Sequence, residues 1–141
     1  MKKIYLIGKK KLYPLCRSLT GSGVRETLKI IKKEFTNLQI KKIRSGTKVF
    51  DWTVPPEWNI SEAYVIDKYG DKIIDFKKNN LHIIGYSTPI QKKLKKNELF
   101  KNLFFSKNQP DAIPYLTSYY KKKWGFCVSF NNFKKIKNSY S

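Results

Sequence analysis

Apolar residues recur at helical spacing near the start of the chain. They follow an i, i+3, i+4, i+7 pattern, which is typical of one face of an amphipathic helix. The members of this stripe are Leu12, Leu15, Cys16 and Leu19. Pro14 suits the first turn of such a helix, where its missing N–H is tolerated. Residues 1–10 are expected to form a loose lead-in.

A second apolar stripe predicts a longer helix over residues 24–35. Its members are Val24, Leu28, Ile31 and Phe35, which share one buried face at helical periodicity. Ser22 or Gly23 is the expected N-cap. Glu26 lies in the first turn, where the helix dipole favours a carboxylate.

The middle of the chain changes to the pattern of β-strands. Residues 63–67 and 72–76 are rich in β-branched and aromatic side chains, and Gly70 lies in the turn between them. We expect a hairpin here. Residues 81–86 predict a third strand, so that the three strands form a small antiparallel meander.

The remaining segments give shorter predictions. Residues 38–43 begin an extended segment, and residues 126–130 predict a short strand. Residues 116–124 fit a helix or a strand. Asn97 is the expected N-cap of a short helix, and a last helix is expected over residues 133–136. The apolar positions of the helix after Asn97 are Leu99, Phe100, Leu103 and Phe104.

Residues 50–59, FDWTVPPEWN, are the most distinctive stretch of the chain. Two prolines fix the backbone and remove two donors, so a stiff, non-helical corner is expected, with a tryptophan toward each end. One hypothesis is a structural corner packed on a sheet, since aromatic side chains dominate protein cores. The other is a ligand groove with two carboxylates as its polar groups. The residues concerned are Asp51, Trp52, Pro55, Glu57 and Trp58.

Composition limits the class of protein. The chain has 141 residues and a formal charge of +20, yet only 3 of its 30 basic residues are arginine. Lysines are spread along the chain, whereas nucleic-acid readers favour arginine for two-point contacts. We therefore do not expect a nucleic-acid partner. The apolar runs are too short for a membrane span or a signal peptide, which favours a cytoplasmic protein.

Candidate metal ligands and nucleophiles are few. Cys16 and Cys127 are far apart and lack a CxxC pattern, so small core residues are expected rather than zinc ligands. His82 is the single histidine and lies in an apolar stretch, where a structural role is the usual one. Residues 21–23, GSG, suit a helix cap better than a phosphate loop. Most carboxylates of the middle third are expected to be solvated or paired with lysines. They are Asp51, Glu57, Glu62, Asp67, Asp71 and Asp75.

Four motifs in order resemble one family. They are LYPLCRSLTGSGVR at 12–25, SGTKVFDWTVPPEWN at 45–59, QPDAIPYLTSYY at 109–120 and WGFC at 124–127. Together they resemble bacterial aminopeptidase-like proteins, relatives of di-zinc exopeptidases that are often associated with polysaccharide gene sets. These proteins contain a small β-rich domain of unknown function.

The resemblance implies an α+β chain with a nested organisation. Residues 1–44 would be the helices and first strand of an α/β exopeptidase-like domain. Residues 45–120 would be the inserted, antiparallel β-rich module. Residues 121–141 would return to the incomplete exopeptidase-like domain. No residue of this chain matches the family's metal-ligand motifs, so no catalytic, cofactor-binding or metal-binding residue is assigned, and zinc is expected only in full-length relatives.

Three hypotheses for function follow. The first is an N-terminal portion of an aminopeptidase-like protein, without catalysis of its own. The second is one half of a split aminopeptidase that is completed by a downstream chain. The third is a basic binding module for nucleic acid or acidic polysaccharide. An incomplete α/β layer leaves apolar surface uncovered, so exposure is expected around Leu28, Ile31 and Phe126, with poor solubility or partner binding.

Overall fold

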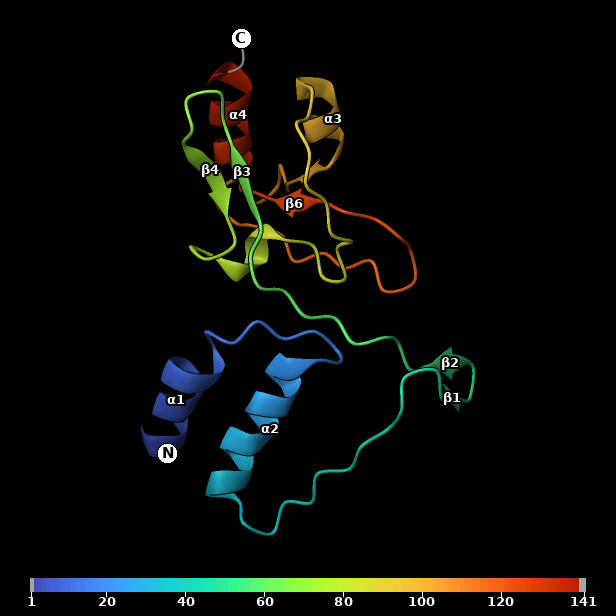
Figure 1. The fold of residues 1–141 in the computed structure, drawn as a ribbon. Helices are drawn as coiled ribbons and strands as arrows, with labels where there is room; N and C mark the ends of the chain where they lie inside the picture. Colours follow the sequence, from blue (N-terminus) through green and yellow to red (C-terminus); the bar gives the residue numbers. More distant parts are fainter. Residues whose placement is uncertain (1, 140–141) are drawn as a thin grey trace. The chain divides into compact units, whose positions relative to one another are not determined.

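The computed structural model describes residues 2–139 and divides into two compact units, Met1–Asn59 (unit 1) and Ile60–Ser141 (unit 2). Both combine helices with short strand pairs, so the chain is a small α+β protein (Figure 1). The nested boundaries expected after residues 44 and 120 remain predictions, because compactness does not show which segments belong to a larger parent domain. Residue 1 and residues 140–141, at the ends of the predicted outer segments, lie outside the described part.

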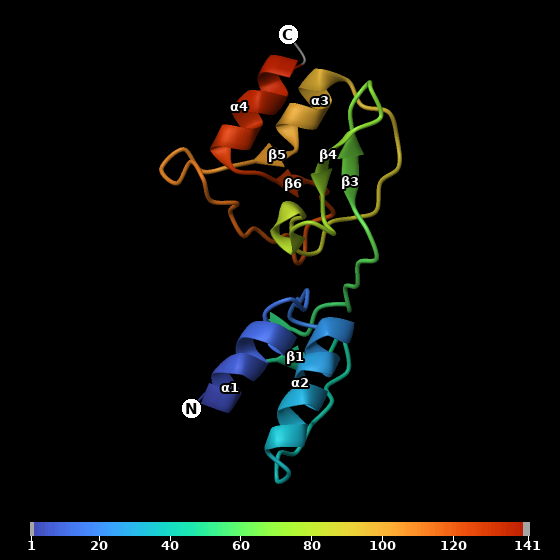
Figure 2. The same cartoon turned by 90° about the vertical axis from the view of Figure 1, so that its left-hand side faces the viewer.

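Unit 1 consists of two neighbouring helical segments and one hairpin. α1, Lys2–Ile7, continues into a π-helical turn, η1, Gly8–Leu12. α2 is Ser22–Glu34, and the hairpin pairs β1, Lys48–Val49, with β2, Trp52–Thr53. An ion pair of 2.8 Å between Lys3 and Glu34 joins α1 to α2, which lie side by side in Figures 1 and 2.

The start of unit 1 corrects the sequence-based prediction. The lead-in expected to be loose is helical, and residues 13–19, where a helix was expected, lie outside any helix. Pro14 accounts for the end of the helical segment, because proline has no backbone N–H to donate to the preceding turn. The α2 prediction is confirmed to within two residues, but its N-cap is Gly21 instead of Ser22 or Gly23.

Unit 2 begins with the predicted hairpin, which is confirmed. β3, Tyr64–Ile66, pairs antiparallel with β4, Lys72–Asp75. The prediction of a third strand over residues 81–86 is wrong. Asn79 accepts a hydrogen bond from the Leu81 N–H at 3.0 Å and precedes a 3-10 helix, η2, Asn80–His82. Beyond it, Ile83 and Gly85 make only isolated bridges, to Phe126 and Thr117.

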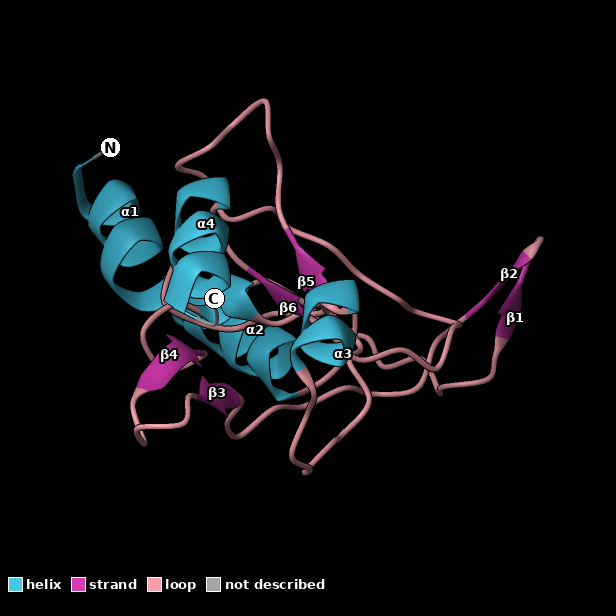
Figure 3. Ribbon diagram, turned by 90° about the horizontal axis from the view of Figure 1, so that it is seen from above, coloured by secondary structure: helices cyan, strands magenta, loops and turns pink. Residues whose placement is uncertain are grey.

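The rest of unit 2 holds a second strand pair and two helices. α3 is Lys96–Lys101, β5 is Leu103–Phe104, β6 is Phe126–Cys127 and α4 is Phe130–Ser139. β5 and β6 run parallel, and α3 and α4 lie at the same end of the unit (Figure 2). Long loops connect these elements in Figure 3.

Several finer predictions for this half are corrected. Lys95, not Asn97, precedes α3, and the apolar residues at its end form β5. Residues 116–124 form neither a helix nor a strand, and residues 38–43 form no strand. α4 starts three residues early, and the Ser129 hydroxyl accepts from the Asn132 N–H at 3.2 Å in its first turn.

The core lies almost entirely in unit 2. Phe126, expected to be exposed, is buried, because β6 pairs with β5 and lies among apolar side chains. Leu28 and Ile31 are half-buried within unit 1, so the expected exposure is at most partial there. The buried apolar residues of unit 2 are Ile74, Ile83, Ile84, Tyr86, Leu99, Leu103, Phe126, Cys127, Val128 and Ile136.

Candidate functional site

The first half of the 50–59 stretch forms a projecting hairpin. Asp51 lies in the turn between β1 and β2, and Trp52 begins β2 with 41% of its surface exposed. The buried members are Val54 and Pro55, at the base of the hairpin. Burial at this corner therefore falls on the residues between the tryptophans, because the hairpin holds Trp52 away from the body of unit 1.

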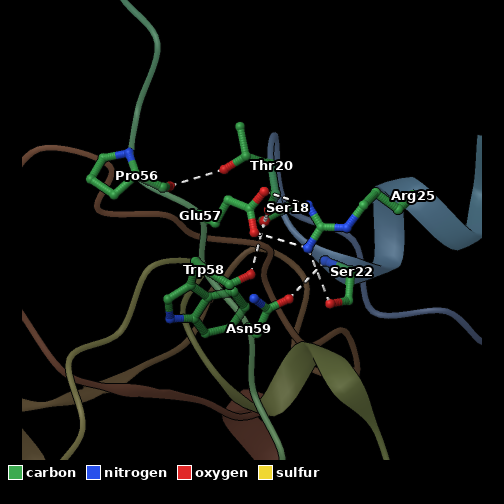
Figure 4. A network of polar contacts seen from close by, with 8 residues as sticks. All are labelled: Ser18, Thr20, Ser22, Arg25, Pro56, Glu57, Trp58 and Asn59. Carbon is green, nitrogen blue, oxygen red and sulfur yellow. Dashed lines mark hydrogen bonds and ion pairs between the residues drawn. The ribbon is translucent and has the colours of Figure 1, made fainter. Parts of the chain in front are cut away.

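The second half of the stretch is pinned to the loop before α2 (Figure 4). The Thr20 hydroxyl donates to the Pro56 carbonyl at 2.9 Å, and the Ser18 hydroxyl reaches the Trp58 carbonyl at 3.5 Å. The Asn59 side-chain oxygen accepts from the Ser22 N–H at 2.7 Å. Segments nearly 40 positions apart are thus joined through hydrogen bonds to backbone groups.

Asn59 caps α2 from a distance. The first turn of a helix leaves backbone N–H groups without intrahelical partners, and a side-chain oxygen usually supplies the bond from the N-cap residue. Gly21 occupies that position and has no side chain, so Asn59 performs the role and accepts from Ser22, which lies 37 positions earlier in the chain. This supports the helix-cap interpretation of residues 21–23, since the Ser22 amide is already occupied.

An ion pair completes the network. The Arg25 guanidinium contacts both carboxylate oxygens of Glu57, with Nη2 at 2.9 Å from Oε2. The hydrogen bond from Arg25, with its charge, lowers the pKa of Glu57, and the same contact raises the pKa of Arg25. Glu57 therefore stays ionised, and the Arg25 guanidinium balances its charge in the two-point geometry that arginine favours.

Two glycines at the start of α2 allow other backbone segments to approach it closely. Gly21 has φ +124°, and a Cβ there would lie 2.5 Å from the Trp58 carbonyl oxygen. A Cβ on Gly23 would lie 2.0 Å from the Cys16 carbonyl oxygen. Only glycine fits both positions without movement of the backbone.

The predicted site residues therefore separate into two groups. Glu57 and Trp58 belong to the polar network, whereas Asp51 and Trp52 belong to the hairpin, with Pro55 buried between them. Sequence reasoning missed Arg25 and Asn59 as partners. The polar residues around α2 were a local signal for a polar contact there. No pattern in the sequence shows which residues of a distant segment will supply the partners.

The candidate donors in unit 2 make contacts within the fold. Nδ1 of His82 lies 2.7 Å from the Cys127 carbonyl oxygen, and burial raises the pKa of the Cys127 thiol to about 11. Asp67 binds the N–H groups of Tyr69 and Asp71, and Glu62 pairs with Lys77 at 3.1 Å, as expected for carboxylates beside lysines.

Among residues 2–139, no three His, Cys, Asp or Glu side chains lie close enough together to hold a metal ion. No helix in that range has the length and apolar character needed to cross a bilayer.

A family profile described as "Domain of unknown function (DUF2172)" matches residues 57–141, which is more than half of the chain. The chain belongs to the DUF2172 family. The match begins next to the division between the two units, so the family's sequence signature covers the whole of unit 2.

Two related proteins extend the DUF2172 chain's similarity into unit 1. A Clostridium acetobutylicum protein, named as a candidate polysaccharide biosynthesis protein with an aminopeptidase-like domain, is 52% identical over 126 residues, covering 89% of this chain and 29% of that protein. The crystal structure of a candidate peptidase from Clostridium acetobutylicum matches with a TM-score of 0.89 and 51% identity, over 95% of this chain and 31% of that one. The resemblance to aminopeptidase-like proteins is thereby confirmed, and this chain spans about a third of their length.

Proposed function

We propose that this chain is a non-catalytic N-terminal part of a zinc exopeptidase-related aminopeptidase-like protein that acts in polysaccharide biosynthesis. The observation that carries the proposal is the close match, over nearly the whole chain, to a peptidase-like structure about three times as long. The relative's name supports the assignment to polysaccharide biosynthesis.

The side chains of this chain support the absence of catalysis. A zinc exopeptidase holds its metal with histidines and carboxylates and keeps one position open for water. Here the chain has a single histidine, no three His, Cys, Asp or Glu side chains of the described residues lie close enough together to hold a metal ion, and Glu57 is paired with Arg25.

Metal-binding residues would then lie in the remainder of the protein, on the same polypeptide or on a partner chain encoded beside it. Co-purification with a partner that carries histidine and carboxylate ligands would distinguish the second arrangement. In either case, the nested α/β arrangement predicted from the sequence describes how this part joins the remainder.

The basic charge gives less support to a nucleic-acid or acidic-polysaccharide module. Residues 1–59 hold 14 basic and 4 acidic side chains, and residues 60–141 hold 16 and 6. The excess is thus +10 in each unit, so neither unit alone carries the basic charge. A salt titration tests this alternative, since phosphate binding weakens steeply with salt.

The decisive experiment is an aminopeptidase assay of the purified 141-residue chain with and without added zinc. We expect no turnover of aminoacyl-p-nitroanilides and no tight, stoichiometric zinc binding by calorimetry. Measurable hydrolysis, or one zinc bound tightly per chain, would refute the proposal.

A further inference from the structure

Phe50 has an unusual place at the tip of the β1–β2 hairpin. Its side chain is fully exposed, at 101% of the reference surface, and its backbone is left-handed with φ +55°. Gly, Asn or Asp normally occupies such a turn position, and a bulky residue there is an outlier. Neither the conformation nor the exposure is favourable for a phenylalanine in this chain alone.

The base of the hairpin holds this tip in place. Val49 pairs with Trp52 and Lys48 with Thr53 across the strands. The Val54 N–H donates to the Thr47 carbonyl at 2.9 Å, and the Gly46 N–H donates to the Val54 carbonyl at 2.8 Å. Since Val54 is also buried, the tip is presented on a rigid base that projects from unit 1 (Figures 1 and 3).

Tyr86 shows how this chain compensates for the same backbone strain elsewhere. It also has a left-handed backbone, with φ +63°, but it is 91% buried. Its ring packs edge-on against Tyr119 with centroids 5.3 Å apart. Strained residues persist where surrounding contacts hold them, and within the described residues Phe50 has no such burial.

Unit 1 as a whole lacks the burial that unit 2 has. Ten exposed large apolar side chains lie in unit 1 and seven in the longer unit 2, among the described residues. Only one of the eleven buried apolar core residues, Val54, belongs to unit 1. A single exposed phenylalanine is ordinary, but an aromatic tip on a unit with so little core indicates an interface.

The comparisons indicate what covers this surface. The family match begins only at residue 57, yet the relatives match across 89% and 95% of this chain, so they share most of unit 1. Some 70% of their length has no counterpart here. That remainder is the part of the protein available to cover unit 1.

We infer that Phe50 inserts into an apolar pocket in the remaining, peptidase-like part of the aminopeptidase-like protein, with Trp52 packing at its side. This inference rests on the proposed function. Aromatic anchors in desolvated pockets dominate interface energies, and burial of Phe50 would offset the cost of its backbone conformation. The partner surface is therefore a concave apolar one, lined by aliphatic or aromatic side chains.

Site-specific photo-crosslinking in the full-length Clostridium acetobutylicum protein tests the inference. A benzophenone amino acid replaces the residue that aligns with Phe50, and after irradiation the linked peptides are identified by mass spectrometry. The control position aligns with Tyr69, which is 76% exposed in the β3–β4 turn of unit 2. We expect a strong cross-link from the first position to a peptide outside the stretch that matches this chain, and none to that peptide from the control.

Other outcomes would overturn the inference. They are a cross-link to a second copy of the protein, seen as a doubled mass, a cross-link confined to the matched stretch, or no cross-link above the control. In the 141-residue chain, neither Phe50→Ser nor Tyr69→Ser should change the melting temperature. A marked fall for Phe50→Ser alone would show that Phe50 stabilises the fold of this chain itself. Neither the cross-linking nor the melting temperature depends on catalysis. Their failure would overturn this inference alone, whereas peptidase activity of the 141-residue chain would refute the proposed function.

Discussion

Arg25 and Glu57 are 32 positions apart in the sequence and meet in a two-point ion pair that joins the first turn of α2 to the end of the Pro-Pro corner. Beside it, Asn59 caps the same helix, and Gly21 has no Cβ to clash with the Trp58 carbonyl oxygen. In unit 1, polar contacts join residues 18–25 to residues 56–59, and we call these contacts the polar seam. In unit 2, the buried apolar residues form the core.

The ion pair predicts a pH dependence of stability. The folded protein lowers the pKa of Glu57, so the pair's contribution is fully present above the unfolded value of about 4.3 and is lost as the pH falls through the folded pKa. Glu57→Gln should lower the urea midpoint at pH 7, and its difference from wild type should vanish in strong acid. The effect should be small and sensitive to salt, because both side chains are exposed.

A matched control for this prediction is Glu26→Gln, which removes a carboxylate on α2 whose lysine partner is 3.7 Å away. It should change the midpoint less than Glu57→Gln does. A double-mutant cycle with Arg25→Gln should show coupling at pH 7. An equal effect of Glu57→Gln at pH 7 and in strong acid would contradict the prediction.

Glycine substitutions test the close approach of the two segments. Gly21→Ala adds a Cβ 2.5 Å from a carbonyl oxygen at φ +124°, and should lower the free energy of unfolding by about 1–3 kcal/mol. Gly8→Ala meets nothing within 4 Å in a helical turn, and should be neutral or stabilising by up to about 1 kcal/mol. Equal melting temperatures for the two variants would show that the seam is not tight.

The distant cap predicts a chemical preference at position 59. Asn59→Ala leaves the Ser22 N–H without its acceptor and should cost about 1 kcal/mol in urea unfolding. Asn59→Asp keeps an acceptor and adds a favourable charge at the helix N-terminus, so it should match or exceed wild type. If alanine and aspartate behaved alike, the cap would contribute nothing.

The two thiols should react at different rates. Burial raises the pKa of Cys127 to about 11 and also raises that of Cys16, which is only partly buried. Because the thiolate is the reactive form, the folded chain at pH 8 should show a faster thiol and a very slow one with a chromogenic disulfide reagent. Cys16→Ser should remove the faster phase, and urea should make Cys127 reactive. Rapid modification of Cys127 in the folded protein would contradict its burial.

Local patterns were sufficient for part of this fold. The apolar spacing of Val24 and Leu28 predicted α2, and the β-branched runs around Gly70 predicted the β3–β4 hairpin. Where an element depended on distant partners, the prediction was wrong. Phe126 is buried because β6 pairs with β5 across a loop of more than twenty residues, and the expected third strand is lost to the Asn79 turn.

The candidate site divides in the same way. The sequence marked residues 50–59 as stiff and aromatic, because proline and tryptophan act locally whatever surrounds them. It could not show that Glu57 meets Arg25 or that Asn59 caps α2, since those contacts exist only after the chain has brought the two segments together.

By itself, the sequence determined α2, the β3–β4 hairpin, the stiffness of residues 50–59 and the family resemblance, because these follow from residue type and short spacing. Only the tertiary structure decided that Val54 and Pro55, and not the tryptophans, are buried, and that Phe50 is left strained and uncovered at a hairpin tip. The physical reason is that burial and strain are properties of what surrounds a residue, and in unit 1 those surroundings come from distant parts of the chain.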